Sequence, residues 1–342
     1  MKNKKMFGQF FTITNPFEVE PFKLWMNTIG IDDETVFLEP FAGANNIVNM
    51  IQDIGYFNKW ACFDILPNNE QNKTDYFIQR RDTLKSFPNN YKIAITNPPY
   101  LAKNSATRSG IKYPNTKYPD LYLYSLDRMI NKIDYCAAII PESFITNPIF
   151  VDRLMMVVSL TCKMFDDTDC PVCLAMFSPK KDKRIFNLSK SDFIIYSMNE
   201  KIGTYNELKK SILKDKKLDI KWIFNDPDGS IGLRGVDNTK CESIKFVKGE
   251  EINSNRIKVS SRSLTRISGL PQNCDLDLFI TLLNKNLKEY RNVTHDVFLT
   301  SFKNLRSDNK YRRRLDFDTA RYILNLTMSE MERIVWITIY QD

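Results

Sequence analysis

The feature of this sequence that most constrains its fold is an alternation, in the first half, of short apolar runs with helical patterns. Four runs, residues 36–38, 60–63, 93–96 and 136–140, contain almost only apolar side chains, as strands buried on both faces do. Between the third and fourth runs, apolar residues recur every three or four positions, which marks one face of a helix. Strands that alternate with helices form parallel sheets with right-handed crossovers. The sequence therefore predicts an α/β fold with a Rossmann-like, doubly wound sheet.

Charge is distributed unevenly between the two halves of the chain. The 342 residues include 49 Lys and Arg and 41 Asp and Glu, and residues 1–179 contain 18 of the basic and 19 of the acidic ones. The remaining 31 basic and 22 acidic residues give residues 180–342 a net charge of +9, more than the +8 of the whole chain. A basic half indicates a polyanionic partner, either nucleic acid or an anionic membrane surface. We predict two domains, 1–179 and a basic, mixed α/β domain at 180–342.

Composition excludes several classes of protein. A hydrophobic content of 43% and a charged content of 26% are typical of a globular chain. No run of 18 apolar residues occurs and no apolar run follows the basic N-terminus, so we expect a cytoplasmic protein without a signal peptide or membrane span. Seven cysteines without framework spacing predict reduced thiols. Cys170 and Cys173 have metal-like spacing, but without a second pair we predict no metal site.

Turn-forming and acidic residues follow the first two predicted strands. The first strand leads into Glu39-Pro-Phe-Ala-Gly-Ala-Asn45, where Gly43 permits a ligand to approach the backbone closely and Asn45 tolerates positive φ. The second strand ends in Asp64, and an acid at this place accepts hydrogen bonds from ribose hydroxyls in nucleoside sites. Ligands of such sheets bind beyond the carboxyl ends of the strands, so both features indicate a nucleoside site. The alternatives are a structural turn at Gly43 and a capping role for Asp64.

The third predicted strand ends in Asn97-Pro98-Pro99-Tyr100. Two consecutive prolines fix φ twice and force Asn97 into an extended conformation. The side-chain oxygen of Asn97 and the carbonyl of Pro98 are then placed to accept both hydrogens of one amino group, while Tyr100 offers a flat face for stacking. The alternative is a loop that simply ends the strand.

These residues resemble motifs of S-adenosylmethionine-dependent amino methyltransferases. Asn97-Pro-Pro-Tyr100 is similar to their catalytic motif. Residues 39–45 are similar to their cofactor-binding turn, with Asn45 in place of the usual last glycine. The resemblance implies a methyltransferase sheet that binds S-adenosylmethionine in residues 1–179.

A third motif lies near the N-terminus. Gly8-Gln-Phe-Phe-Thr12 resembles the motif that folds over the cofactor in DNA adenine methyltransferases, with Ile13 in place of the usual proline. The order of N-terminal motif, cofactor turn, catalytic motif and C-terminal recognition region is that of the gamma class. The resemblance covers roughly residues 7–178, and we expect residues 180–342 to be the target-recognition domain.

The resemblance implies roles for individual residues. Thr12 would contact the methionine end of the cofactor, Asp64 the ribose, and Asp82 the adenine amino group of the cofactor. Residues 139–144 resemble the strand and turn near the active site, and residues 163–177 resemble the last hairpin, in which Phe165 would stack on the target base. The alternative for Phe165 is a core phenylalanine. The full set of implied cofactor-binding residues is Phe11, Thr12, Glu39, Phe41, Gly43, Asp64, Asp82 and Asn97, and the implied catalytic residues are Asn97, Pro98, Pro99, Tyr100 and Phe165.

The activity that the resemblance implies is site-specific methylation of adenine N6 in double-stranded DNA, with the base flipped out of the duplex, as in restriction-modification systems. Candidate phosphate contacts are the basic stretches 180–184, 209–210, 214–217, 256–266 and 311–314. We expect a monomer, without membrane association, and a restriction endonuclease acting on the same site is a further partner that the resemblance allows. The alternatives are an RNA guanine-N2 or protein glutamine methyltransferase of the same fold, or a non-catalytic nucleic-acid-binding module.

Overall fold

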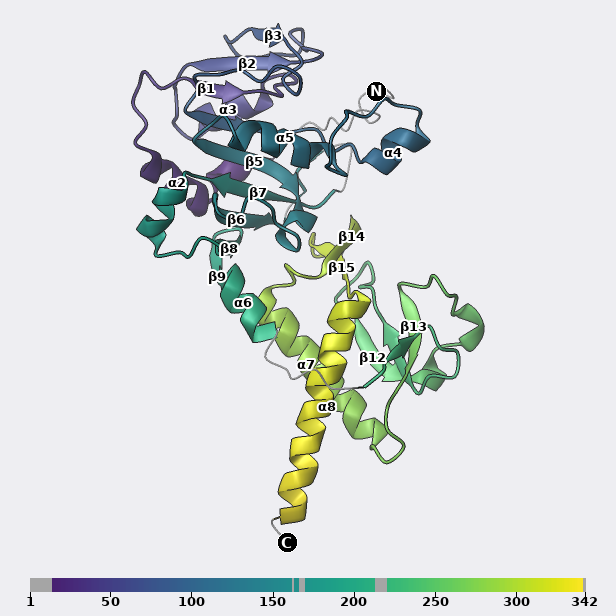
Figure 1. Ribbon diagram of the computed structural model, residues 1–342. Helices are drawn as coiled ribbons and strands as arrows, with labels where there is room; N and C mark the ends of the chain where they lie inside the picture. The colour runs from purple at the N-terminus through teal and green to yellow at the C-terminus, as the bar shows by residue number, and fades with distance from the viewer. Residues whose placement is uncertain (1–13, 162, 166–169, 213–219, 341–342) are drawn as a thin grey trace. The chain divides into compact units, whose positions relative to one another are not determined.

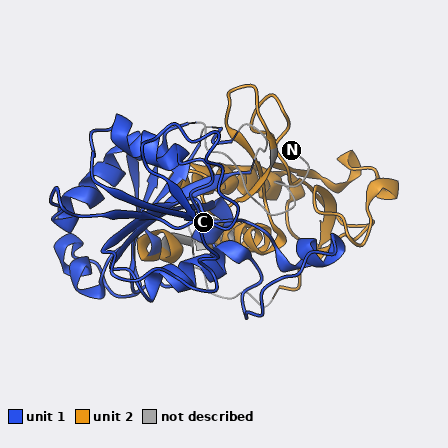
Figure 2. Cartoon of the chain, turned by 90° about the horizontal axis from the view of Figure 1, so that it is seen from above, with its two compact units in different colours: residues 1–205 blue, residues 206–342 orange. Residues whose placement is uncertain are grey.

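The computed structural model describes residues 14–161, 163–165, 170–212 and 220–340 (Figure 1). The chain divides into two compact units, residues 1–205 and residues 206–342, which are coloured separately in Figure 2. We call them the first unit and the second unit.

The first unit is built on a nine-stranded sheet with the order β3-β2-β1-β4-β5-β7-β6-β8-β9. The strands are β1 Phe37–Glu39, β2 Trp60–Asp64, β3 Ile78–Arg80, β4 Ile93–Thr96, β5 Tyr135–Pro141, β6 Leu154–Leu160, β7 Val172–Phe177, β8 Ile194–Ser197 and β9 Glu200–Thr204. Neighbours from β3 to β5 are parallel, and the order 3-2-1-4-5 is that of a doubly wound sheet. The predicted α/β, Rossmann-like fold is confirmed.

Two strands run against the predicted parallel direction: β9, which pairs antiparallel with β8 at the edge of the sheet, and β7. β7 lies between β5 and β6 and pairs antiparallel with both, so the sheet is mixed. Of the segment 163–177, for which a hairpin is predicted, β7 is a strand, and its partner β6 ends at Leu160, before that segment. All residues of β6 and β7 are buried. A strand buried on both faces gives no alternation in sequence, and such a pattern does not record strand direction.

Amphipathic helices connect and cover these strands. In α2, the side chains of Phe22, Trp25, Met26 and Ile29 recur at three- and four-residue spacing and are buried in the core of the sheet. The helix α5 lies between β4 and β5, as the sequence predicts. The helices of the first unit are η1 Pro16–Glu18, α2 Glu20–Ile29, α3 Asn46–Asp53, α4 Lys103–Arg108, α5 Leu121–Ile130, η2 Glu142–Ile145 and η3 Lys180–Phe186, and α6 Tyr205–Ile212 begins at the last residue of the unit.

The division between the units falls after Tyr205 rather than at the predicted position 179. Residues 180–204 belong with the sheet because β8 pairs in parallel with β6. Lys183, in the stretch considered for phosphate contacts, is buried, and its ammonium donates to the carbonyl oxygens of Val151, at 2.6 Å, and Asp192. These hydrogen bonds join the segment before β8 to the sheet, and the Lys183 ammonium is not available to a polyanion.

The second unit combines a four-stranded antiparallel sheet, of order β10-β13-β11-β12, with a two-stranded hairpin and two long helices. Asp275 begins α7 by accepting hydrogen bonds from the backbone N–H groups of Asp277 and Leu278. In the described residues, no helix combines the length and apolar character needed to cross a membrane. The elements are β10 Ile223–Phe224, β11 Ile231–Arg234, β12 Lys245–Lys248, β13 Leu264–Ser268, β14 Thr300–Leu305, β15 Tyr311–Arg314, η4 Gly249–Glu251, η5 Ser254–Arg256, α7 Leu276–Thr294 and α8 Phe317–Tyr340.

Part of the positive charge of the second unit is structural. Arg291 is buried and pairs with Asp237 at 3.0 Å and with Asp296 at 2.7 Å. Arg313, in the predicted stretch 311–314, is also buried and donates to Ser301 at 2.7 Å. The stretch 214–217 lies outside the described residues. Within the stretch 256–266, the exposed cations are Arg256, Lys258 and Arg262.

Candidate active site

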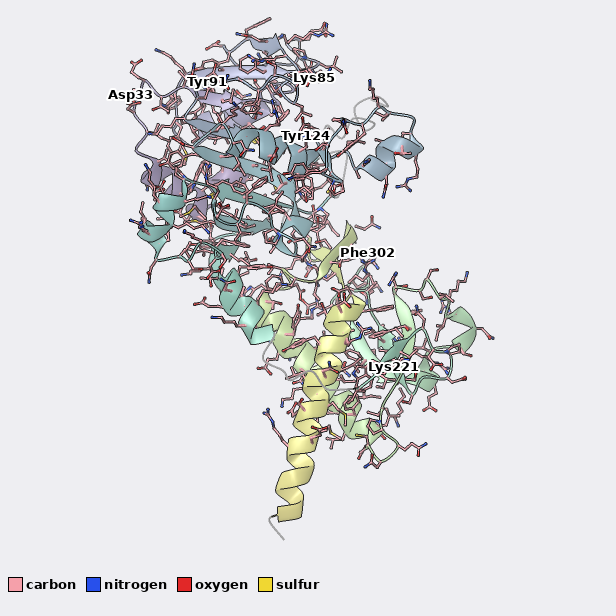
Figure 3. The ribbon with its side chains drawn as sticks, viewed as in Figure 1. Asp33, Lys85, Tyr91, Tyr124, Lys221 and Phe302 are labelled. Carbon is pink, nitrogen blue, oxygen red and sulfur yellow. The ribbon has the colours of Figure 1, made fainter. Side chains whose placement is uncertain are left out.

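A cavity of about 760 Å³ opens in the first unit beside the carboxyl ends of β1, β2, β3 and β4. These four strands are neighbours and parallel, so residues that follow them meet at one edge of the sheet. Figure 3 labels Lys85 and Tyr124, which line the cavity, on one side of the unit, and Asp33 and Tyr91 on the other. The predicted site residues that line the cavity are Phe41, Gly43, Asp64, Asp82, Asn97 and Pro99.

The turn after β1 brings backbone to the wall of the cavity. Gly43 has φ +57° and Asn45 has φ 59°, so the left-handed conformation expected for Asn45 is observed. Asn45 is fully buried, and its amide nitrogen donates to the hydroxyl of Thr74 at 3.0 Å and the carbonyl of Tyr76 at 2.8 Å. These bonds fix the start of α3 at the cavity edge. The side chain that replaces the usual last glycine is therefore accommodated.

Asp64 joins the turn after β1 to the turn after β2 through two hydrogen bonds. Its Oδ2 accepts a hydrogen bond from the backbone N–H of Gly43 at 2.9 Å, and its Oδ1 accepts one from the N–H of Leu66 at 2.7 Å. The residue is only 4% exposed. A carboxylate offers about four acceptor positions, so a structural role and a contact with a ribose hydroxyl are compatible at this residue.

Glu39, the last residue of β1, lies behind the wall. It is 1% exposed, and its Oε1 accepts from the hydroxyl of Thr96 at 2.5 Å and from the N–H of Phe41 at 3.0 Å. Oε2 has no hydrogen-bond partner among the described residues. Burial raises the pKa of Glu39 to about 8, against the opposing hydrogen bonds from Thr96 and Phe41. A buried carboxyl oxygen without a partner suits a cationic ligand group.

Asp82 follows β3 at the rim. Its carboxylate pairs with the Lys85 ammonium at 3.1 Å and accepts from the Lys85 N–H at 3.2 Å. The side chain is 26% exposed. This acid is therefore held at the cavity rim by the next turn of the chain, where a ligand amino group can reach it.

Asn97 directly follows β4, and its orientation is set by Tyr100. The Tyr100 hydroxyl lies 2.6 Å from Asn97 Oδ1 and 2.8 Å from the carbonyl oxygen of Ile139. Burial raises the pKa of Tyr100 well above its ordinary value, so the hydroxyl keeps its proton and acts as a donor. The Asn97 carboxamide is thus turned by a hydrogen bond that the sequence alone did not indicate. Pro98 is buried, whereas Pro99 lines the cavity.

The aromatic residues behind the motif pack edge to face. The Tyr100 ring lies 6.4 Å from that of Tyr122 and 6.1 Å from that of Phe165, both in T-shaped arrangements. Phe165 has no exposed surface, which favours the alternative of a core phenylalanine over direct stacking on a base. Phe11 and Thr12 lie outside the described residues.

Sequence reasoning missed several apolar residues of the wall. Ile65 and Leu66, directly after Asp64, are 50% and 54% exposed and line the cavity. Leu84, two residues after Asp82, also lines it. The available signal is the position of each apolar residue next to an acid at a strand end. A flat apolar ligand group fits between such side chains.

Cys170 is not a nucleophile in this arrangement. Burial, with a smaller contribution from the charge of Glu142, raises the pKa of Cys170 to about 11. The thiol therefore stays protonated at neutral pH, and the thiolate is the reactive form. In the described residues, no cluster of His, Cys, Asp or Glu is suited to hold a metal ion.

No protein-family profile and no curated protein sequence matches this chain. Among solved structures, a type I restriction-modification methyltransferase subunit from Streptococcus thermophilus is similar, with 13% identity, TM-score 0.36, and coverage of 61% of this chain and 54% of that one. A modification subunit of a putative type I restriction enzyme from Vibrio vulnificus has 12% identity and TM-score 0.37, with coverage of 56% and 47%. A putative class I S-adenosylmethionine-dependent methyltransferase from Listeria monocytogenes has 9% identity and TM-score 0.32, with coverage of 49% and 62%.

The matched region of this chain thus spans about half the length of the first two structures. At these identities and TM-scores the likeness is remote.

Proposed function

We propose that this protein is an S-adenosylmethionine-dependent methyltransferase that methylates N6 of adenine in DNA at specific sites. The observation that carries the proposal is that one cavity is lined by the Gly43 turn, Asp64 and Asp82 on one side and by Asn97 and Pro99 on the other. A nucleoside site and an amino-group acceptor thereby meet in one space. A volume of about 760 Å³ lies within the roughly 300–1,000 Å³ of ligand pockets.

The cavity wall fits the cofactor. Glu39 Oε2, buried and without a partner among the described residues, would accept from the ammonium of the methionine part, and Asp64 would hold the ribose hydroxyls. Asp82 would accept from the adenine amino group, while Ile65 and Leu84 would contact the adenine faces. When bound, S-adenosylmethionine supplies an electrophilic methyl group on a sulfonium.

The Asn97 motif would prepare the nucleophile. The lone pair of an adenine amino group is delocalised into the ring, so the nitrogen is a poor nucleophile. Acceptors at Asn97 Oδ1 and the Pro98 carbonyl draw the amino hydrogens into hydrogen bonds, favour tetrahedral geometry and concentrate the lone pair on nitrogen. These acceptors would hold the nitrogen in line with the methyl group, so that the N–CH3 bond would form as the S–CH3 bond breaks and the nitrogen would release one of its two protons to solvent. The Tyr100 hydroxyl, 2.6 Å from Asn97 Oδ1, holds the carboxamide in place.

The choice of DNA as substrate rests on the N-terminal resemblance and on charge. An adenine inside a duplex is out of reach, so the base must be flipped at a cost of a few kcal/mol. Residues 180–342 carry +9, and Arg256, Lys258 and Arg262 are exposed in the second unit. Exposed cations of this kind neutralise phosphates and make binding salt-dependent. A restriction endonuclease recognising the same site remains part of the proposal.

The test is incubation of the protein with labelled S-adenosylmethionine and separate pools of duplex DNA, RNA and protein. We expect label in DNA, and complete digestion of the DNA to nucleosides should release it as N6-methyl-2′-deoxyadenosine. Asn97→Ala is expected to lower the rate by about 10²–10³-fold, the range seen when one stabilising hydrogen-bond partner is removed from an active site, while cofactor affinity stays within threefold.

The control variant is Asn27→Ala, which changes an exposed asparagine of α2 that does not line the cavity. Its rate should remain within threefold of wild type. Label found only in RNA or only in protein would overturn the DNA assignment. Failure to bind the cofactor would favour the non-catalytic alternative.

A further inference from the structure

A long excursion of the chain leaves the sheet directly after the Asn97 motif. Its two ends are held together: Ala102 and Asp120 form an antiparallel bridge, the N–H of Lys103 donates to the Pro119 carbonyl at 2.7 Å, and the N–H of Leu121 donates to the Leu101 carbonyl at 2.9 Å. Residues 103–119, which include α4, form the excursion, and Figure 1 shows α4 set apart from the sheet. We call residues 103–119 the basic arm.

The charge of the basic arm differs from that of its surroundings. The arm contains no acidic residue and four cations, Lys103, Arg108, Lys112 and Lys117. All four are exposed. Taking these four from the 18 basic residues of 1–179 leaves 14 against 19 acidic ones, a net charge of −5. The near-zero net charge of residues 1–179 is therefore the sum of a basic arm and an acidic remainder.

These cations are not balanced by ion pairs. Among the described residues, none of the four makes a salt bridge, whereas other exposed lysines of the same unit do, such as Lys59 with Glu34 at 3.5 Å and Lys85 with Asp82 at 3.1 Å. Four uncompensated like charges on 17 residues repel one another, and an anionic partner relieves that repulsion.

The inner side of the arm belongs to the cavity. Residues 111–115, with Lys112 and Tyr113 among them, line the wall. The arm is also anchored to α5, because the Tyr118 hydroxyl donates to Asp127 at 3.0 Å and its ring stacks with that of Tyr124 at 6.4 Å. Lys112 thus lines the proposed active site, and the other three cations lie on the same ordered segment.

We propose that the basic arm binds the DNA phosphates that flank the target adenine, an inference that rests on the proposed function. A flipped nucleotide remains joined to its strand, so its neighbouring phosphates must pass the cavity mouth. The acidic remainder of the residues 1–179 repels them, and the basic arm supplies the compensating charge beside the reacting base. Recognition of the polyanion is then shared between the two halves of the chain.

The experiment compares two fourfold variants with the same change of charge. The arm variant combines Lys103→Gln, Arg108→Gln, Lys112→Gln and Lys117→Gln. The control variant combines Lys59→Gln, Lys92→Gln, Lys132→Gln and Lys190→Gln, exposed lysines that precede β2, β4, β5 and β8 at the amino edge of the sheet, opposite the cavity. Duplex DNA affinity is measured by fluorescence anisotropy between 50 and 200 mM NaCl, together with cofactor affinity by calorimetry and methyl transfer at saturating DNA.

For the arm variant we expect DNA affinity to fall about 10–50-fold at low salt, and the slope of log affinity against log salt to decrease by about 2–4, because each phosphate contact contributes about 0.9 to the slope. Far-ultraviolet circular dichroism should match wild type, which shows that the variant folds. Cofactor affinity should fall by much less than DNA affinity, because only Lys112 of the four cations lines the cavity, and the control variant should match wild type within threefold.

An arm variant with the wild-type salt slope, or a control variant with an equal loss, would overturn the role of the basic arm. That outcome leaves the proposed function intact if the wild type methylates DNA. Conversely, a wild type that transfers no methyl group would overturn the proposed function, and the DNA-binding measurements would still decide for or against the arm.

Discussion

Two buried acids, Asp237 in the second unit and Glu39 in the first, differ in how their oxygens are paired. In the second unit, Asp237 is fully buried, and its carboxylate accepts from the Arg291 guanidinium at 3.0 and 3.1 Å and from the N–H groups of Ser243 and Ile244. In the first unit, Glu39 is equally buried, but only one of its oxygens has a partner among the described residues. At Asp237 both oxygens are paired with groups of the second unit, and these bonds stabilise its fold. A buried acid with an unpaired oxygen beside a cavity suits a ligand.

The pKa values of these acids move in opposite directions. Burial alone would raise the pKa of Asp237, but the hydrogen bonds from Arg291 and the backbone outweigh it and hold the value below the ordinary one. Burial prevails at Glu39 and raises its pKa to about 8. At neutral pH, Asp237 is therefore charged and Glu39 mostly protonated. A cationic ligand that approaches Glu39 would favour release of its proton.

The largest effect is expected on the free energy of unfolding when the buried ion pairs of Arg291 are removed. Arg291→Met leaves Asp237 and Asp296 without a shared partner, and removing one member of a buried ion pair costs about 3–5 kcal/mol of unfolding free energy. Urea unfolding with hydrogen exchange should locate the loss in the second unit. The matched control is Arg321→Met, whose ion pair with Asp318 is exposed and is worth less than about 1 kcal/mol. Equal losses in the two variants would contradict the comparison.

The second-largest effect is expected on the pH dependence of the free energy of unfolding. Glu39 binds its proton more tightly in the folded than in the unfolded chain, so its contribution to stability is complete below about pH 4.5 and is lost as the pH rises toward 8. Between pH 5 and pH 8, we expect cofactor-free wild type to lose about 2–4 kcal/mol relative to Glu39→Gln. Unfolding at the two pH values measures this, and parallel slopes for the two proteins would refute it.

Asp237 is expected to change the free energy of unfolding with pH in the opposite direction. Its lowered pKa gives stability that is present above the ordinary pKa of an aspartate and is lost as the pH falls through the folded value. The free energy of unfolding of wild type should therefore fall toward low pH because of Asp237 in the second unit, and toward high pH because of Glu39 in the first unit.

A smaller effect is expected on cofactor affinity. Under the proposed function, Glu39→Gln would remove a charge-assisted hydrogen bond to the ammonium of the cofactor. Such a bond is worth about 1.5–3 kcal/mol, so we expect roughly a 10–100-fold rise in Kd. Calorimetry at pH 7.5 measures it. Glu34→Gln, which changes an exposed acid paired with Lys59, serves as the control. An unchanged Kd in Glu39→Gln would mean that the unpaired oxygen does not face the ligand.

The smallest effect is expected at the apolar wall. Leu84→Ala removes part of the surface that would contact the adenine of the cofactor, and the loss of about 1 kcal/mol should raise Kd about fivefold. Leu24→Ala, on a half-exposed position of α2, is expected to leave Kd unchanged. Equal Kd values for the two variants would place the adenine elsewhere in the cavity.

Much of the first unit was predictable because its signals are local. The apolar runs at β1, β2, β4 and β5 require no knowledge of the rest of the chain, and parallel pairing then brings Asp64 and Asn97 to one edge. The antiparallel direction of β7 was not predictable, because its residues are all buried and show no alternation. Strand direction is decided by connections and partners, not by composition.

The details of the site depend on contacts between distant residues. The bond from Tyr100 to Ile139 spans 39 residues, and the burial of Lys183 depends on carbonyl groups of Val151 and Asp192. A lysine in a charged stretch resembles a solvated one until its neighbours are known. For the same reason, the basic stretches of the sequence overstated the positive charge available to a polyanion.

The closed base of the basic arm has an evolutionary consequence. Because Ala102 and Asp120 are paired and the hydrogen bonds beside them join the two ends, the sheet needs only that closure and does not depend on the length of what lies between. A segment with adjacent ends tolerates replacement better than one that spans the core. Related chains could therefore exchange residues 103–119 for insertions of other size and charge, and so acquire new substrates without rebuilding the chemistry beneath.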